Sequence, residues 1–279
     1  MEGNACYRYR TIAGYLRRHG RPPVLTCLDI GCNIGAVAKE ILDTFPGCRL
    51  WAFDVMPDLA AACRKNLARY GDRVTVRNAA ITAQHLFQDD LGTKPHPQPK
   101  PLTIWQATPA AGSGWWGGHK VGWLGDSLPP VYRERADLNV QAVTLDELIA
   151  ELGPVDFLKT DCEGSECSFL GAATEPTLRS VRWIGGEYHG LRRFYPVKEK
   201  LSVTHRVNLV GDGRIGSFFC QRHDEQPGLL RSSPLTPLVY PHLVPNTPIT
   251  WWPFDPDQVP QREWLAHGIT RHPIVKDHV

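Results

Sequence analysis

The sequence predicts an α/β fold built on a mostly parallel sheet of seven strands. Residues 25–45 read as a short apolar strand, a loop with two glycines and an amphipathic helix. Apolar strands with polar ends then alternate with helical segments as far as residue 189, and residues 204–222 read as an antiparallel hairpin. Five strands joined by helices and followed by a hairpin argue against the six-stranded parallel sheet of dehydrogenases.

Before the first strand, residues 6–19 have helical spacing, with Ile12, Tyr15 and Leu16 on one apolar face. Gly20 and a proline pair end this segment. Arginines gather around it, at Arg8, Arg10, Arg17, Arg18 and Arg21. The simplest interpretation is a solvated helix face, and the alternative is a patch for an acidic substrate or nucleic acid.

The loop after the first strand is the first candidate binding site. A helix N-terminus follows it, where free backbone N–H groups and a partial positive charge face the loop. The dinucleotide fingerprint G-x-G-x-x-G requires a glycine where this chain has Asn33, so a pyrophosphate ligand is disfavoured. The pattern D-x-G-x-x-x-G suits S-adenosylmethionine (SAM), which has no pyrophosphate. The cofactor-binding residues expected here are Asp29, Gly31, Cys32, Asn33 and Gly35.

Two further strands are expected to complete the cofactor site. The strand 49–54 ends in Asp54, nineteen residues past Gly35, where an acid can accept hydrogen bonds from ribose hydroxyls. The alternative role for Asp54 is a helix N-cap, because a helix begins near Pro57 and runs to residue 70. The strand 74–81 follows. We expect cofactor contacts from Asp54, Val55, Asn78 and Ala79.

Residues 82–140 break the alternation of strands and helices. They hold four prolines between 95 and 101, a strand-like run at 102–106, and a glycine-flanked pair of tryptophans, Trp115 and Trp116. The tryptophan loop is expected either to close on an organic surface or to pack on the edge of the sheet. His119 in the same loop is a weaker candidate base.

The alternation returns near residue 143. Thr144 and Glu147 form a capping box that begins a helix, which Gly153 ends. The next strand, 155–161, ends in Asp161, and residues 162–166 turn into another helix. The fifth strand, 181–189, carries Glu187 and His189 at its carboxyl end.

The chain divides into three expected parts: an N-terminal helix (1–23), a catalytic domain (24–222) with the insertion 82–140, and an extension (223–279) rich in proline and tryptophan. The extension is too rich in proline for a regular domain and too aromatic for a plain disordered linker. We expect it to lie across the main domain or across a partner subunit, which would make the protein a homo-oligomer.

Composition and cysteine spacing argue against a nucleic-acid-binding, membrane-spanning or zinc-binding protein. The 279 residues carry a net charge of +2, so no broad basic face for nucleic acid is demanded. No apolar run is long enough to span a membrane, and the N-terminus lacks the apolar core of a signal peptide. None of the eight cysteines has the C-x-x-C spacing of a zinc site. Buried, reduced thiols and a cytoplasmic location are expected.

Residues 28–35 (LDIGCNIG) and 155–166 (VDFLKTDCEGSE) together resemble the FkbM family of SAM-dependent methyltransferases. That family shows a D-x-G-x-N-x-G loop and a later D-x-x-K-x-D-x-E-G-x-E segment, and the resemblance covers roughly residues 25–222. It implies a Rossmann-like SAM-methyltransferase fold with a C-terminal antiparallel hairpin. It also implies SAM as cofactor and methylation of oxygen atoms on small molecules or sugars.

Roles at the site follow from methyl transfer, which requires an aligned donor and acceptor and often a base. We expect Asp29 to anchor the methionine end of SAM, Asp54 its ribose and Asn78 its adenine. Asp161 would reach either the cofactor or the acceptor.

The catalytic candidates are Glu163, Glu187 and His189, of which His189 has the most suitable ordinary pKa. Asp161, Glu187 and His189 could instead bind a divalent ion, but spacing alone cannot bring them together, so no metal ligand is assigned.

The function expected is therefore methylation of a hydroxyl oxygen on a small molecule, sugar or glycan. One alternative keeps the enzyme class and makes nucleic acid the acceptor. A second is a non-catalytic interaction module, against which the acids at the strand ends argue. A nicotinamide-dependent reductase is disfavoured by Asn33.

Overall fold

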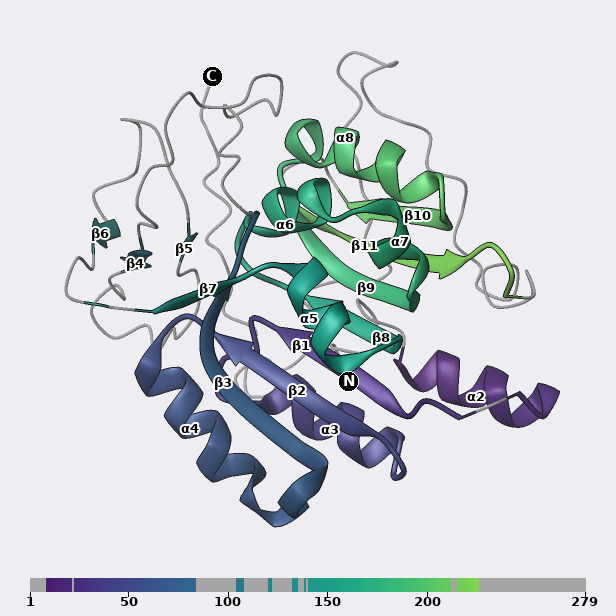
Figure 1. The fold of residues 1–279 in the computed structure, drawn as a ribbon, viewed down its shortest axis with the longest axis horizontal. Helices are drawn as coiled ribbons and strands as arrows, with labels where there is room; N and C mark the ends of the chain where they lie inside the picture. The colour runs from purple at the N-terminus through teal and green to yellow at the C-terminus, as the bar shows by residue number, and fades with distance from the viewer. Residues whose placement is uncertain are drawn as a thin grey trace, which may run out of the picture.

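The main sheet contains eight strands: β1 (Thr26–Ile30), β2 (Arg49–Asp54), β3 (Val74–Ile81), β7 (Gln141–Val143), β8 (Val155–Thr160), β9 (Val181–His189), β10 (His205–Gly211) and β11 (Ile215–Arg222). The structure is a computed structural model and describes residues 9–21, 23–83, 104–107, 120–121, 132–134, 138, 140–211 and 215–225. The strand order is β10-β11-β9-β8-β1-β2-β3-β7 (Figure 1).

Six neighbouring strands, from β9 to β7, are parallel, and the hairpin β10-β11 adds antiparallel to β9. The predicted parallel sheet with a terminal hairpin is confirmed, but the predicted count of seven strands is wrong by one. The additional strand is β7, which pairs with the end of β3. Its three residues are too few to show an alternating pattern, and two of them are exposed.

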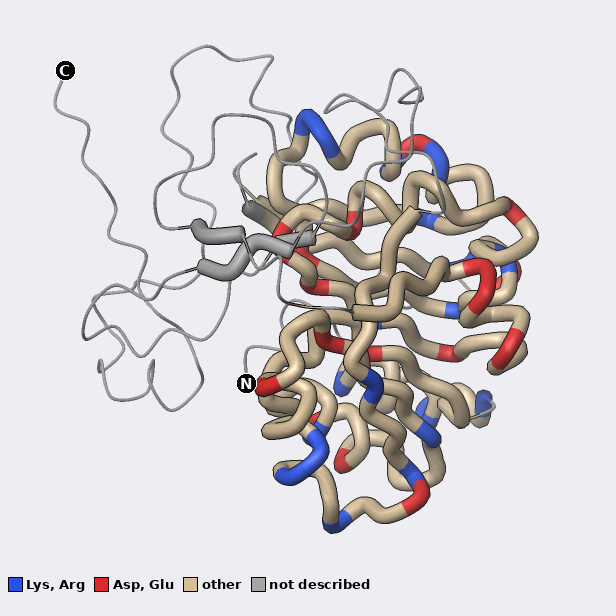
Figure 2. The backbone as a smooth tube through the Cα atoms, turned by 60° about the vertical axis from the view of Figure 1, so that its left-hand side comes forward, with Lys and Arg blue, Asp and Glu red and all other residues tan. Residues whose placement is uncertain are grey.

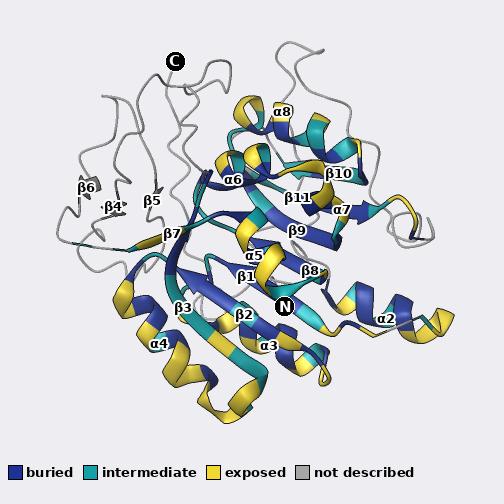
Figure 3. Ribbon diagram, viewed as in Figure 1, coloured by how far each residue is buried: buried dark blue, intermediate teal, exposed yellow. Residues whose placement is uncertain are grey.

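In the described part of the chain, helices α2 to α8 cover the two faces of the sheet, which gives three layers (Figures 1 and 3). One face carries α2 (Tyr9–His19), α3 (Ala36–Thr44) and α4 (Pro57–Leu67). The other carries α5 (Leu145–Leu152), α6 (Glu166–Ala172), α7 (Glu175–Arg179) and α8 (Leu191–Ser202). In Figure 3 the central strands are mostly buried, whereas the outer sides of the helices are exposed.

Burial on both faces explains why the central strands read as continuous apolar runs. An apolar core lies on each face of the sheet, and successive residues of β1 belong to different cores. Cys27 packs with α2, α3 and α4, whereas Leu28 packs with the helices of the other face. In β9, Trp183 and Ile184 are divided between the two cores in the same way. The side chains alternate, but both sets are apolar.

Local sequence signals account for several helix ends. The Thr144 side chain caps α5 by accepting from the Glu147 N–H at 3.1 Å, and the Glu147 carboxylate accepts from the Thr144 N–H at 2.7 Å. The helix expected to run to residue 70 stops at Leu67. A 3₁₀ turn, Ala68–Arg73, continues from it, and Gly71 has a φ of 58° inside that turn.

Part of the insertion forms a second sheet from β4 (Ile104–Ala107), β5 (Lys120–Val121) and β6 (Tyr132–Glu134), in the order β5-β4-β6. The tryptophan loop, with Trp115, Trp116 and His119, lies outside the described residues, and so does the extension from residue 226. The proposed domain boundaries remain predictions.

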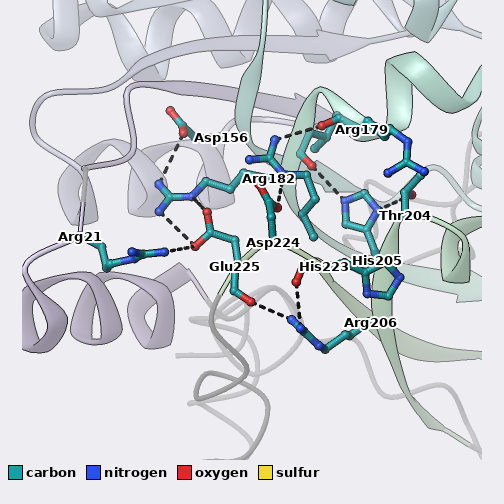
Figure 4. A network of polar contacts seen from close by, with 12 residues as sticks. Arg21, Asp156, Arg179, Arg182, Thr204, His205, Arg206, His223, Asp224 and Glu225 are labelled. Carbon is teal, nitrogen blue, oxygen red and sulfur yellow. Dashed lines mark hydrogen bonds and ion pairs between the residues drawn. The ribbon is translucent and has the colours of Figure 1, made fainter.

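A buried polar network lies at the amino ends of β8 and β9 (Figure 4). Arg182 of β9 forms an ion pair with Glu225, which follows β11, and its Nη2 lies 3.3 Å from Glu225 Oε2. Arg182 also approaches Asp156 of β8 at 3.7 Å. Arg21, which follows α2, lies 3.7 Å from the same Glu225 carboxylate. The network therefore joins the chain before β1 to the chain after β11.

The described cysteines, from Cys27 to Cys220, are all free thiols, and five of the seven are buried. Among the residues that the structure describes, no helix combines the length and apolar character needed to cross a bilayer.

Candidate active site

The glycine loop after β1 holds three residues with left-handed backbone angles: Gly31 (φ 76°), Asn33 (φ 50°) and Gly35 (φ 88°). A Cβ atom at Gly31 would lie 1.9 Å from the Asp161 carbonyl oxygen, so no other residue fits. A Cβ at Gly35 would lie 2.9 Å from Cys63 Sγ. Asparagine is among the residues that tolerate the left-handed region, which explains how Asn33 is accommodated.

Backbone hydrogen bonds hold the loop against the end of β2. The N–H groups of Gly31 and Cys32 both donate to the Phe53 carbonyl at 2.9 Å. The Ile34 N–H donates to Asn33 Oδ1 at 2.7 Å. The N-cap residue of α3 is Gly35, which has no side chain to cap the helix that begins directly after it. The loop therefore presents backbone groups and a positive helix end at the carboxyl edge of the sheet.

Asp54 supports this loop from β2. Its Oδ2 accepts from the Asn33 N–H at 2.8 Å and its Oδ1 accepts from the Met56 N–H at 2.9 Å. Met56, not Asp54, is the N-cap residue of α4. Burial raises the pKa of the Asp54 carboxyl to about 6, although the two N–H donors oppose that shift. Asp54 is thus a buried carboxylate at the expected ribose position.

Three other predicted cofactor residues lie beside Asp54. The Asn78 amide donates to the carbonyls of Asp54 and Val55, at 2.9 Å in each case. Ala79 is buried and pairs with Gln141 of β7. Asn78 of β3 thus holds the carboxyl end of β2 by two hydrogen bonds. Its contact with adenine remains a prediction.

Asp29 lies inside the sheet rather than at its edge. It is fully buried, stands opposite Lys159 in the register of β1 and β8, and its Oδ1 lies 2.9 Å from Lys159 Nζ. Burial raises the pKa of the Asp29 carboxyl, and the Lys159 ammonium opposes this. Lys159 also donates to the Gly31 carbonyl at 2.6 Å. Asp29 therefore holds the lysine that binds the loop, and in this structure it supports the loop indirectly.

Asp161, Glu187 and His189 come together at the carboxyl ends of β8 and β9. One ligand-type atom from each lies within 4.8 Å of the other two, and all three residues are half-buried. Thr160 pairs with Gly186, so Asp161 follows β8 at the level of Glu187. Glu187 and His189 are two residues apart on one strand and therefore face the same side.

His189 lies between two glutamates. Its Nδ1 is 3.2 Å from Glu166 Oε1, and its Nε2 is 3.3 Å from Glu163 Oε2. Burial opposes a charged imidazole, but the hydrogen bond and charge of Glu166, with the charges of Glu163 and Asp161, raise the pKa of His189 to about 9.

Sequence reasoning gave Glu166 no role. The side chain is fully buried at the first residue of α6, where its Oε1 also accepts from the His189 N–H at 3.0 Å and its Oε2 accepts from the Gly164 N–H at 2.9 Å. The signal in the sequence that could have indicated Glu166 is its place as the second glutamate of the E-G-x-E motif. The motif gave no indication that the carboxyl would be buried against His189.

The loop and the cluster are neighbours. Besides the close approach of Gly31, the Asp161 N–H donates to the Ile30 carbonyl at 3.1 Å. The structure thus brings together the expected cofactor residues of the loop and Asp54 on one side, and Asp161, Glu163, Glu187 and His189 on the other.

Comparison with known proteins identifies a family. The family model for the methyltransferase FkbM domain matches residues 29–204. The 2-O-methyltransferase NoeI of Sinorhizobium fredii is 27% identical over 169 residues, which cover 58% of this chain and 62% of that protein. The chain thus matches less than two thirds of the length of this relative.

Solved structures found to be similar to this chain include a SAM-dependent methyltransferase from Aquifex aeolicus, with 10% identity, a TM-score of 0.36, and coverage of 78% of this chain and 92% of that chain. The N-terminal domain of human METTL16 in complex with SAH has 15% identity and a TM-score of 0.38, and covers 77% of this chain and 69% of that chain.

Proposed function

The chain belongs to the FkbM methyltransferase family, and we propose that it is a SAM-dependent methyltransferase that methylates a hydroxyl oxygen of a sugar, glycan or other small molecule. The observation that supports this most is the contact between the Gly31 loop and Asp161. Because of that contact, the residues at the carboxyl ends of β8 and β9, which include the catalytic candidates, lie next to the loop that would hold the methyl donor.

The residues of the loop fit SAM. Their backbone groups, the uncapped N-terminus of α3 and the buried Asp54 carboxylate supply donors for a carboxylate and acceptors for ribose hydroxyls. Gly31 lets the loop lie directly against the Asp161 backbone. Lys159 holds the loop in place through the Gly31 carbonyl. SAM, when bound, supplies an electrophilic methyl group on a sulfonium.

The cluster at the carboxyl ends of β8 and β9 handles the acceptor. In methyl transfer the acceptor hydroxyl oxygen would take the methyl group from the sulfur of the donor and would lose its proton. Glu163 and His189 are in contact, and because the pKa of His189 is raised to about 9, its imidazole is charged at neutral pH and the proton passes to the Glu163 carboxylate beside it. Glu187 lies beside them and orients the hydroxyl by accepting a hydrogen bond. Glu163, Glu187 and His189 keep their predicted roles as catalytic candidates.

The NoeI match supports oxygen as the atom that receives the methyl group, since that relative is named a 2-O-methyltransferase. A sugar or glycan carries neighbouring hydroxyls that several carboxylates can orient at once. In the described part of the chain, two of the arginines considered for nucleic acid form ion pairs, Arg10 with Glu40 and Arg21 with Glu225. Basic and acidic segments are interspersed along the described backbone (Figure 2). These observations favour a small acceptor over nucleic acid.

The test is transfer of label from methyl-labelled SAM to a panel of monosaccharides, oligosaccharides and phenolic or aliphatic alcohols, with total RNA as the competing acceptor. We expect transfer to at least one hydroxyl compound and none to RNA. Transfer to RNA alone, by folded protein that binds SAM, would overturn the proposed acceptor class. The C-terminal extension and any homo-oligomer formed through it remain predictions.

A further inference from the structure

We propose that Asp161, Glu187 and His189 bind one divalent cation of the Mn²⁺ type beside the glycine loop. Binding of the ion is independent of the proposed acceptor. Its role, which is to hold and activate the acceptor hydroxyl, rests on the proposed function.

The first support is geometric. Two carboxylates and one imidazole come from the ends of two paired strands, and their ligand-type atoms all lie within 4.8 Å of one another. Neighbouring ligands of a hexacoordinate ion with bonds of about 2.1 Å lie about 3 Å apart, and opposite ligands about 4 Å apart. Small rotations of the three half-buried side chains would therefore bring their ligand atoms to the separations found around a single ion.

The second support is the fixed orientation of the His189 ring. Glu166 is fully buried and takes both the backbone N–H of His189, at 3.0 Å, and Nδ1, at 3.2 Å. A ligating histidine usually has its other ring nitrogen held by a carboxylate in this way. Nδ1 is therefore committed to Glu166. Nε2 faces the side of the ring where the Glu163 carboxylate lies at 3.3 Å.

The third support is the balance of charge. Four carboxylates surround one imidazole, those of Asp161, Glu163, Glu166 and Glu187. Lys159 is paired with Asp29 at 2.9 Å and also acts electrostatically on Asp161. The guanidinium of Arg193, in the first turn of α8, comes within 3.8 Å of a Cβ position at Gly164 and supplies one further positive charge. Carboxylates this close together repel one another, and a divalent ion between them would offset that repulsion.

The donor set indicates which ion. Carboxylates suit Mg²⁺, Ca²⁺ and Mn²⁺, whereas imidazole suits transition metals. Two carboxylates with one imidazole therefore favour Mn²⁺, a transition metal that accepts a set of mainly oxygen ligands. Three protein ligands leave three positions open in a six-coordinate shell. Neighbouring hydroxyls of an acceptor could occupy two of them, where the ion would lower the pKa of the attacking hydroxyl. His189 would then be a ligand, and Glu163, which is outside the three, would take the proton.

The experiment is a titration of the chelator-treated, full-length protein with Mn²⁺, followed by the loss of the free-ion electron paramagnetic resonance signal. We expect one saturable site per chain in the wild type. The double variant Asp161→Asn/Glu187→Gln should lose at least ten-fold in Mn²⁺ affinity. Glu175→Gln is the matched control, because Glu175 is an exposed acid of α7 paired with Arg179, and it should bind as the wild type does.

The absence of a saturable site in the folded wild type at millimolar Mn²⁺ would overturn the inference, whatever the variants do. Equal affinity of the wild type and the folded double variant would also overturn it. A parallel titration with SAM separates this inference from the proposed function. Asp54→Asn should weaken SAM binding and leave Mn²⁺ binding unchanged, and a loss of Mn²⁺ binding in this variant would contradict the assigned ligands.

Discussion

Gly31 and Asp161 are in backbone contact, so close that a Cβ atom on residue 31 would fall 1.9 Å from the Asp161 carbonyl oxygen. This contact couples the loop that would hold the methyl donor to the cluster that would handle the acceptor. It explains why residue 31 is a glycine, although 130 residues separate it from the backbone that it contacts.

Gly31→Ala should disturb both sides of the site. The substitution adds left-handed strain, which costs roughly 1–2 kcal/mol, and an overlap with the Asp161 backbone that forces a shift. We expect a lower melting temperature and at least a ten-fold loss of SAM affinity by calorimetry. Gly47→Ala is the control, since Gly47 has no atom within 4 Å of its Cβ position. Wild-type SAM affinity in Gly31→Ala would contradict the contact.

Asp54 should make SAM binding depend on pH. Burial raises the pKa of its carboxyl to about 6, so the carboxylate predominates above pH 6 and the neutral acid below it. The neutral acid is a poorer acceptor for ribose hydroxyls and for the Asn33 N–H. SAM affinity should therefore fall as pH decreases through about 6.

The Asp54→Asn variant should bind SAM about ten-fold more weakly at pH 7.5 and lose this pH dependence. Calorimetry between pH 5 and 8 measures both effects. Asp72→Asn, an exposed acid in the 3₁₀ turn, serves as the control and should keep the wild-type profile. An unchanged pH profile in Asp54→Asn would remove Asp54 from the cofactor site.

Lys159→Met should strongly destabilise the fold. The substitution leaves the fully buried Asp29 without its partner at 2.9 Å, and breaking such a pair costs about 3–5 kcal/mol. The double variant Asp29→Leu/Lys159→Met should recover much of the lost stability, because no buried charge remains. Urea unfolding monitored by circular dichroism gives both values. Equal stability of Lys159→Met and the wild type would show that the pair contributes little.

Glu225→Ala should reduce stability by about 3 kcal/mol, because it leaves the buried Arg182 without its main partner. SAM affinity should not change, since this network lies at the amino ends of the strands, away from the glycine loop. The neighbouring Asp224→Ala removes an exposed ion pair with Arg222 and should cost less than about 1 kcal/mol. Thermal unfolding and calorimetry distinguish the two effects. A loss of SAM affinity in Glu225→Ala would contradict this separation.

Much of the fold could be predicted because the central strands are buried on both faces and so read as uninterrupted apolar runs. Strand β9 begins and ends where the sequence predicts it, at Val181 and His189. Strand β7 could not be predicted, since its three residues pair with β3 across the long insertion between residues 82 and 140. Pairing across such a distance leaves no local signal.

The candidate site was predicted as a set of residues but not as a set of contacts. Asp161, Glu187 and His189 follow from the rule that ligands bind at the carboxyl ends of parallel strands. The pairing of Asp29 with Lys159 depends on the register of β1 and β8, and the burial of Glu166 depends on how α6 packs beside β9. Register and packing are decided by the whole sheet, so a single sequence shows neither.

The atom that receives the methyl group is the most direct test of the proposed function. Purified protein, ¹³C-methyl-labelled SAM and an acceptor found in the hydroxyl panel should give a product whose labelled carbon has the chemical shift of an O-methyl group. The same product should fail to form with folded Glu187→Gln/His189→Gln protein that still binds SAM. A labelled carbon on nitrogen or on carbon, or full activity of that double variant, would contradict the proposed function.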